Sequence, residues 1–220
     1  MNDIKLLIFD WDGTLMDSVQ HIVDSLNAAI QQLDLAPRHH DDLKNVIGLG
    51  MREAIAAIYP DQVDDAFAAQ FVEAYREYFF AEDARQSMFA GARETLQQLQ
   101  SQNYVLAVAT GKSRHGLNHA LSDTGLHGMF VESRCADETR SKPDPLMLEE
   151  ILESLNMKAQ HAIMIGDTEY DLAMARAAGV HPLGVSYGVH DRERLQKHKP
   201  VHILDAIQEL PGWLSSQRLS

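Results

Sequence analysis

Phe9-Asp10-Trp11-Asp12-Gly13-Thr14-Leu15 is the stretch that decides the fold. It follows the apolar run 4–9, whose length and composition are typical of a buried strand. Asp10 and Asp12 therefore lie where a strand ends and a turn begins. In an open α/β sheet, this edge is where ligands bind. One such carboxylate can stay ionised as nucleophile and metal ligand while the other donates a proton. An Asp-Gly turn closing a hairpin is the alternative that this stretch alone leaves open.

The segment 16–86 is predicted to be entirely helical. Apolar residues recur at helical spacing between Val19 and Leu33 and again between Val63 and Phe79. The aromatic stripe of the second run is interpreted as core rather than as a ligand pocket. Between the two runs, a further helix opens near residues 39–42, and the glycine-punctuated loop 48–52 leads into a helix over 53–58.

From residue 87 onward, apolar strand patterns alternate with amphipathic helix patterns. This alternation predicts a parallel sheet with right-handed crossovers. The expected fold class is α/β: a Rossmann-like core of residues 1–15 and 87–220, interrupted by an all-helical cap domain of residues 16–86. Strands are expected at 104–109, 130–133, 162–165, 182–185 and 201–204, and helices at 92–100, 114–124, 146–156, 170–178 and 206–214.

Composition narrows the possible partners. The formal net charge of −13 argues against binding to nucleic acid and requires any attraction of an anionic substrate to be local. No apolar stretch approaches membrane-spanning length, and no basic region precedes the first apolar run, so neither membrane association nor a signal peptide is expected. Cys135 is the only cysteine, is interpreted as a packing residue, and favours a cytoplasmic location.

Three further strand ends carry candidate functional groups, which a parallel sheet would bring to one edge. Thr110 and Gly111 offer a hydroxyl and a backbone N–H that suit a phosphoryl oxygen. Lys142 could offset the charge of a carboxylate and a phosphoryl group. Asp167 and Asp171 stand four residues apart and supply the hard oxygen ligands that Mg²⁺ prefers. Each group also has a structural alternative. Thr110 and Gly111 could form a plain strand-to-helix turn, Lys142 could be a solvated surface lysine, and Asp167 and Asp171 could cap a helix.

Taken in order, these motifs resemble those of the haloacid dehalogenase superfamily, and they cover nearly the whole chain. The helical insertion after the first motif resembles the C1-type cap of that superfamily, and the chain is similar to its phosphoglycolate-phosphatase-like branch. The matching residues are Asp10-Trp11-Asp12-Gly13-Thr14, Thr110-Gly111, Lys142-Pro143, and Gly166-Asp167 with Asp171.

The resemblance implies a Mg²⁺-dependent phosphatase that works through a phosphoaspartate. Asp10 would be the nucleophile, and Asp12 would protonate the leaving oxygen and then activate water. Thr110 and the Gly111 amide would hold the phosphoryl group, and Lys142 would stabilise its charge.

The resemblance also implies how the metal is held. Mg²⁺ would bind Asp10, the backbone carbonyl of Asp12, and Asp167. Asp171 would act through water or by orienting Lys142, and Thr14 would help to position Asp12 and the turn.

Substrate identity stays open at this point: phosphoglycolate, a sugar phosphate and a nucleotide all fit as the small phosphate ester. Arg52, after the glycine-punctuated loop, is the best candidate for contacting the leaving group, and Lys112 is interpreted as a surface cation. The protein is expected to be a monomer or a homodimer. A phosphomutase of the same superfamily, disfavoured by Thr14, and a non-catalytic binding or regulatory protein are the alternatives. A dehalogenase is disfavoured by Asp12.

Overall fold

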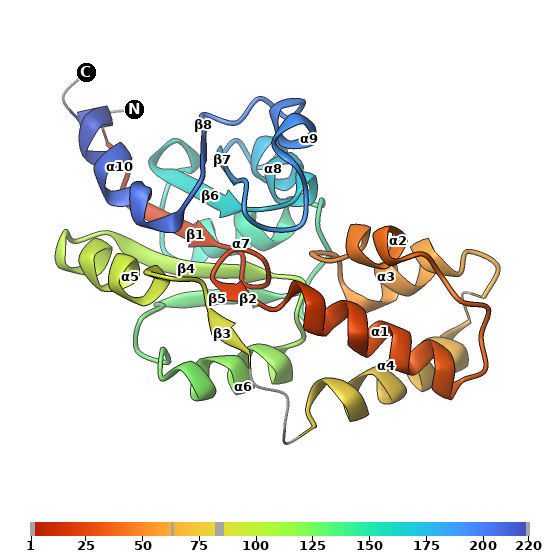
Figure 1. The fold of residues 1–220 in the computed structure, drawn as a ribbon. Helices are drawn as coiled ribbons and strands as arrows, with labels where there is room; N and C mark the ends of the chain where they lie inside the picture. Colours follow the sequence, from red (N-terminus) through yellow and green to blue (C-terminus); the bar gives the residue numbers. More distant parts are fainter. Residues whose placement is uncertain (1–2, 63, 82–85, 219–220) are drawn as a thin grey trace.

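A six-stranded parallel sheet forms the centre of the larger lobe (Figure 1). A computed structural model describes residues 3–62, 64–81 and 86–218. The strand order is β5-β4-β1-β6-β7-β8, so the chain builds outward from β1 in both directions. The strands are β1 (Leu6–Phe9), β4 (Val105–Thr110), β5 (Glu132–Cys135), β6 (Ala162–Gly166), β7 (His181–Val185) and β8 (His202–Leu204).

Helices cover both faces of this sheet, because successive side chains of a strand point to opposite faces. Leu7 and Phe9 of β1 pack in one apolar cluster with α5 (Ala92–Ser101), α6 (Arg114–Thr124) and α10 (Leu210–Arg218). Leu6 and Ile8 pack in another with α7 (Leu146–Ser154) and α8 (Glu169–Ala177). The remaining short elements are α9 (Arg192–Gln196), η1 (Ala159–His161) and η2 (Ile207–Glu209).

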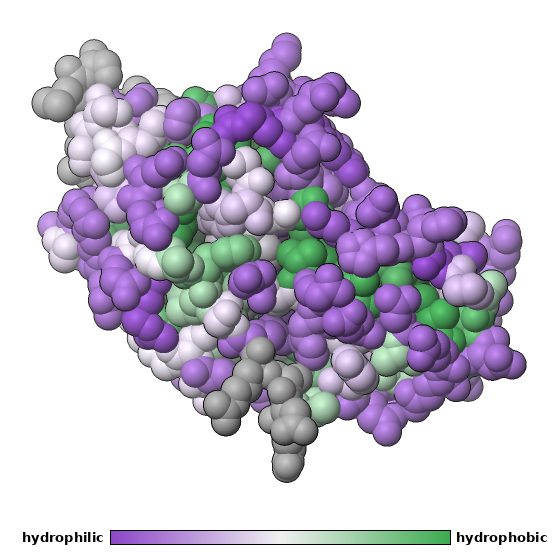
Figure 2. Space-filling model, in the orientation of Figure 1, coloured by the Kyte–Doolittle hydropathy of each residue, from purple (hydrophilic) through white to green (hydrophobic). Residues whose placement is uncertain are grey.

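The smaller lobe is helical and lies beside the sheet (right in Figure 1). Its helices are α1 (Val19–Gln32), α2 (His40–Asn45), α3 (Met51–Ile58) and α4 (Asp65–Phe79). They share an apolar cluster of their own, in which Phe71 is fully buried. On the face seen in Figure 2, hydrophilic residues predominate, and hydrophobic ones gather between the lobes and along the helical lobe.

The predicted fold class, a Rossmann-like parallel sheet with inserted helices, is confirmed. Helix α6 has the expected bounds and ends at Gly125, whose φ of +64° suits a residue without a Cβ. The strand expected at 130–133 lies slightly later, at β5, and the helix expected at 206–214 is divided into η2 and α10. Val63 lies outside the described residues. No described helix combines the length and the apolar character that crossing a membrane requires.

Two features escaped sequence analysis because they are too short for a hydrophobic period to be visible. One is α9, a single short helix. The other is the antiparallel pairing of β2 (Met16–Asp17) with β3 (Ser87–Met88), which joins the segments that enter and leave the helical lobe.

Candidate active site

Side chains from three neighbouring strands meet at the carboxyl edge of the sheet. Strand β1 pairs with β4 on one side and with β6 on the other. Asp10 directly follows β1, Thr110 ends β4, and Asp167 directly follows β6. All three are buried, at 1%, 1% and 0% exposure. The sheet therefore brings together residues that lie 57 to 157 positions apart in the chain, as the sequence predicted for this edge.

Lys142 lies at the centre of this group and forms two buried ion pairs. Its Nζ is 2.7 Å from Oδ1 of Asp10 and 2.7 Å from Oδ1 of Asp171. Burial alone would lower the pKa of Lys142, but the two carboxylates outweigh it and raise that pKa. Asp171 is fixed from its other side, where Oδ2 accepts hydrogen bonds from the N–H and the hydroxyl of Thr168. Lys142 is thus held as a cation, and Asp171 orients it.

Asp10 keeps one carboxylate oxygen free. Its Oδ1 faces Lys142, whereas the buried Oδ2 has no hydrogen-bond partner among the described residues. Burial raises the pKa of Asp10 well above its ordinary value; Lys142 opposes this shift, and Asp171 and Asp167 add to it. A buried, unpartnered carboxylate oxygen is costly unless a ligand engages it. Asp10 therefore offers Oδ2 to something that the site binds.

Asp167 is held between the turn after β1 and the loop after β7. Its Oδ1 accepts a hydrogen bond of 2.8 Å from the Thr14 hydroxyl, and Oδ2 accepts one of 2.8 Å from the Val189 N–H. Burial, and then the charge of Asp171, raise the pKa of Asp167 to about 7. Thr14 was expected to position Asp12, but its side chain contacts Asp167 instead. The loop after Asp10 and the end of β6 are thereby held together.

Asp12 is held by two other groups. Ser18 donates a hydrogen bond of 2.6 Å to Oδ1, and the Nζ of Lys112 lies 3.0 and 2.9 Å from the two carboxylate oxygens. Lys112 was interpreted as a surface cation, yet its side chain is only 8% exposed, and its Nζ lies 4.8 Å from the ring centroid of Phe79 in α4. The position of Lys112 directly after Thr110-Gly111 indicated that it could lie near the site. The sequence does not reveal which carboxylate it contacts.

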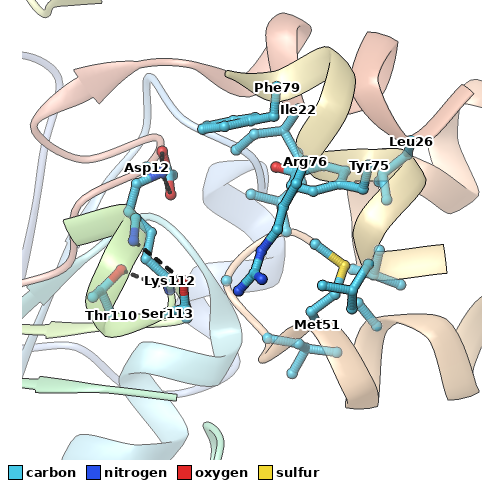
Figure 3. Close-up of a pocket in the computed structure, with 18 of the residues that line it drawn as sticks. Asp12, Ile22, Leu26, Met51, Tyr75, Arg76, Phe79, Thr110, Lys112 and Ser113 are labelled. Carbon is cyan, nitrogen blue, oxygen red and sulfur yellow. Dashed lines mark hydrogen bonds and ion pairs between the residues drawn. The ribbon is translucent and has the colours of Figure 1, made fainter. Parts of the chain in front are cut away.

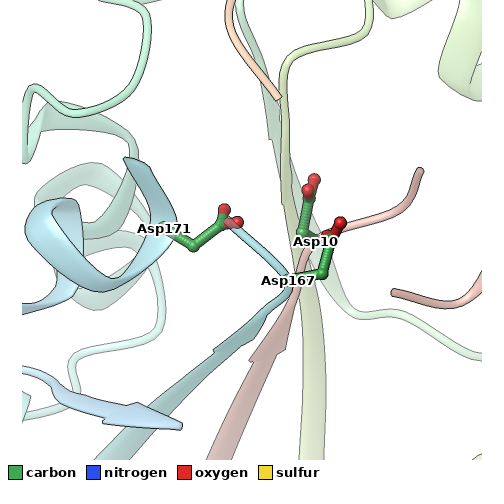
Figure 4. Close-up of side chains that lie close together, drawn as sticks. All are labelled: Asp10, Asp167 and Asp171. Carbon is green, nitrogen blue, oxygen red and sulfur yellow. The ribbon is translucent and has the colours of Figure 1, made fainter. Parts of the chain in front are cut away.

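The three buried carboxylates could together hold a metal ion. Asp10, Asp167 and Asp171 each place one oxygen within 4.8 Å of the others (Figure 4). Both oxygens of Asp171 already have partners, whereas Asp10 Oδ2 has none. A Cβ on Gly13 would come within 2.2 Å of Asp167 Oδ2, so a side chain at position 13 would displace this carboxylate. An all-carboxylate oxygen set suits a hard divalent cation.

A cavity of about 110 Å³ lies between the two lobes and reaches Asp10 and Asp12 (Figure 3). Thr110 and Gly111 line it from the sheet side, and Tyr75, Arg76 and Phe79 of α4 line it from the helical side. The aromatic stripe of α4 was interpreted as core; Phe71 is core, but Tyr75 and Phe79 also reach the cavity.

Arg52 is not brought to this cavity. Its guanidinium pairs with Asp65 at 2.5 Å, and the two side chains are 69% and 82% exposed. The arginine that lines the cavity is Arg76, which sequence analysis did not single out. Arg76 lies three residues before Phe79 and four after Val72, so it shares a helix face with both, and both line the cavity. This spacing could have identified Arg76 from the sequence.

The loop before α3 packs directly on the sheet lobe. Gly50 donates a hydrogen bond of 2.7 Å from its N–H to the Ser141 hydroxyl. A Cβ on Gly111 would lie 2.5 Å from the Leu49 carbonyl oxygen, so only glycine admits this approach. The helical lobe thus covers the phosphoryl-binding candidates Thr110 and Gly111.

Cys135 ends β5 and is paired in the sheet with Thr110 of β4. It is fully buried in the sheet lobe, and burial raises the pKa of its thiol to about 12. The side chain packs as a small apolar group, as predicted.

Comparison with known proteins agrees with the fold. The model of the haloacid dehalogenase-like hydrolase family matches residues 7–185. A probable phosphatase of Dickeya dadantii is 33% identical over 94% of this chain and 92% of its own length. A phosphoglycolate phosphatase of Rhodospirillum rubrum is 33% identical over 96% of this chain and 90% of its own length. A crystal structure of a predicted phosphatase from Clostridium acetobutylicum superposes with a TM-score of 0.86 at 27% identity, covering 97% of this chain and 99% of the other.

The chain therefore belongs to the haloacid dehalogenase-like hydrolases, as an enzyme of their phosphatase class. The resemblance inferred from the sequence motifs is confirmed. Within the family, the chain is similar to phosphoglycolate phosphatases.

Proposed function

We propose that this enzyme is a Mg²⁺-dependent phosphatase that hydrolyses a small phosphomonoester through a phosphoaspartate on Asp10. The observation that carries the proposal is the free, buried Oδ2 of Asp10, at the end of β1 and within reach of the cavity. Because Lys142 holds the other oxygen, Oδ2 is the atom left to attack a phosphorus or to bind a metal.

Asp10, Asp167 and the backbone carbonyl of Asp12 would hold the Mg²⁺. A bound Mg²⁺ supplies charge that offsets the phosphoryl dianion and keeps the buried carboxylates ionised. Asp171 is better suited to orienting Lys142, since Lys142 and Thr168 already engage its carboxylate.

The chain's own residues account for the remaining steps. Thr110 and the Gly111 N–H bind phosphoryl oxygens, and Lys142 offsets the charge that develops there. Asp10 attacks phosphorus, and the leaving oxygen takes a proton from Asp12. Asp12 then removes a proton from the water that hydrolyses the phosphoaspartate. Lys112 and Ser18 hold the Asp12 side chain at the cavity wall, and they stabilise its carboxylate form, which acts as the base in the second step.

The helical lobe, residues 16–86, would act as a cap that closes over the site and excludes water. The loop contact between Gly50 and Ser141 and the apolar cavity wall support this role.

Phosphate release from p-nitrophenyl phosphate and a panel of metabolite phosphates, with Mg²⁺ and after chelation, tests this proposal. We expect metal-dependent turnover that Asp10→Asn abolishes. Arg52→Gln, on the outer surface of the helical lobe, is the matched control and should retain activity. Turnover that survives Asp10→Asn, or that chelation leaves unchanged, would contradict the proposed chemistry.

A further inference from the structure

The loop after β7 packs closely against the carboxylate of Asp167. Val189 donates a hydrogen bond of 2.8 Å from its N–H to Asp167 Oδ2. A Cβ on Gly188 would lie 2.3 Å from the same oxygen, so only glycine admits so close an approach of the loop backbone. The Tyr187 hydroxyl donates a hydrogen bond of 2.9 Å to the carbonyl of Thr14, whose side chain holds the other oxygen of Asp167. The position of this loop therefore decides how the Asp167 carboxylate is oriented.

The side chain of Val189 belongs to the core of the other lobe. It is buried in the apolar cluster formed by the helices of the segment 16–86. In the part of the chain that the structure describes, Val189 is the only member of that cluster from outside this segment. One residue thus packs into the helical lobe with its side chain and bonds Asp167 with its backbone. Because a hydrogen bond weakens steeply with distance and angle, any shift of Val189 with the helical lobe weakens its bond to Asp167.

Polar contacts strengthen the same junction between the lobes. The Tyr170 hydroxyl donates a hydrogen bond of 2.9 Å to the carbonyl of Asn45, the last residue of α2. Arg194 of α9 bonds the side-chain oxygen of Asn45 and also pairs with Glu169, the first residue of α8. The helical lobe is therefore attached to the start of α8, directly after Asp167 in the chain, as well as to the loop after β7.

We infer that Val189 is a positioning residue, which couples the packing of the helical lobe to the orientation of the Asp167 carboxylate. The consequence for metal affinity rests on the proposed function, in which Asp167 holds Mg²⁺. Mg²⁺ demands closely defined ligand positions, and groups that orient its ligands affect its affinity strongly. The site therefore binds Mg²⁺ most tightly when the two lobes are packed together. Since such coupling is reciprocal, bound Mg²⁺ stabilises the packing of the lobes to the same extent.

Calorimetric titration with Mg²⁺ alone provides the first test. Val189→Ala removes two methyl groups from the helical cluster but keeps the N–H that bonds Asp167. Removing a group that orients a metal ligand costs about 10- to 100-fold in affinity. Because the N–H itself remains, we expect Val189→Ala to weaken Mg²⁺ binding by about three- to tenfold. Val189→Thr, which keeps the shape but places a hydroxyl in the cluster, should weaken it in the same direction and serves if the alanine variant does not fold.

Val180→Ala is the matched control for this titration. It deletes the same atoms from a buried valine of the sheet lobe that lies just before β7, at the opposite end of that strand from the loop. Its Mg²⁺ affinity should equal that of wild type. A loss of affinity that is the same in Val180→Ala and Val189→Ala would refute the inference, because it would reflect general destabilisation.

Amide hydrogen exchange of the metal-free protein, read by NMR, provides a test that needs no metal. Phe71→Leu loosens the helical cluster without altering any residue of the sheet lobe. If the lobes are coupled through Val189, this change should speed exchange of the Val189 amide by about threefold or more and leave the amides of β6 unchanged.

The two measurements separate this inference from the proposed function. If wild type binds Mg²⁺ and Val189→Ala binds it equally tightly, the inference is refuted while the proposed metal site stands. If wild type binds no Mg²⁺, the proposed chemistry fails, and faster exchange of the Val189 amide in Phe71→Leu still supports the coupling between the lobes. Exchange of that amide at the wild-type rate in Phe71→Leu would refute the coupling whatever the titration shows.

Discussion

Replacing Lys112 by methionine removes the cation that holds Asp12 but keeps most of the side-chain volume. Its Nζ lies 2.9 and 3.0 Å from the two Asp12 oxygens, and the side chains are 8% and 11% exposed. A hydrogen bond to a charged partner in such a setting contributes about 1.5–3 kcal/mol. If Lys112 positions Asp12 during proton transfer, Lys112→Met should therefore lower kcat by roughly 10- to 150-fold.

Steady-state kinetics with p-nitrophenyl phosphate and saturating Mg²⁺ provide the measurement, with KM expected to change less than kcat. Lys112→Arg keeps a cation at this position and should recover part of the loss. Lys5→Met is the matched control, since Lys5 is 58% exposed and its pair with Asp3 at 3.5 Å contributes little. A folded Lys112→Met enzyme with kcat within threefold of wild type would refute the positioning role.

Three further changes test other parts of the structure. Gly13→Ala places a methyl group 2.2 Å from Asp167 Oδ2, at a residue whose φ is +78°. Calorimetry should therefore detect metal binding weakened at least tenfold. An unchanged affinity would show that Asp167 is not a metal ligand. Burial, and then Arg194, lower the pKa of His190 to about 4, so the folded protein loses on the order of 3 kcal/mol as pH falls from about 6.5 through 4. Denaturant unfolding at a series of pH values should detect this loss in wild type but not in His190→Gln. The same dependence of unfolding free energy on pH in both proteins would contradict it. Phe71→Ala empties a fully buried position in the helical lobe and should cost about 3–5 kcal/mol in thermal unfolding; a cost below 1 kcal/mol would mean that the lobe's core does not depend on Phe71.

Local sequence determined the elements and the edge at which the chemistry collects. The apolar run before Asp10 and the apolar run before Asp167 each read as a buried strand, and both are central strands of the sheet. A parallel sheet leaves little choice about where the carboxyl ends of its strands meet. Asp10, Thr110, Lys142 and Asp167 could therefore be grouped from their order alone, and the structure brings them together.

Tertiary structure alone decided which side chain meets which. Lys112 follows Thr110 by two residues, yet its partner is Asp12, a hundred positions earlier. Thr14 reaches Asp167, far along the chain, rather than the nearby Asp12. Hydrophobic periodicity fixes the face on which a residue lies, but the direction of a polar side chain depends on neighbours from distant segments.

The same reason explains the two arginines. Arg52 follows a loop that packs on the sheet lobe, but its own side chain turns outward to Asp65. Arg76 belongs to a helix whose apolar stripe was sufficient to predict a core and gave no indication of a cavity. Whether a helix face meets another helix or an open space depends on how the two lobes pack together. Sequence periodicity carries no information about that packing, because it records only the burial preferences of one segment at a time.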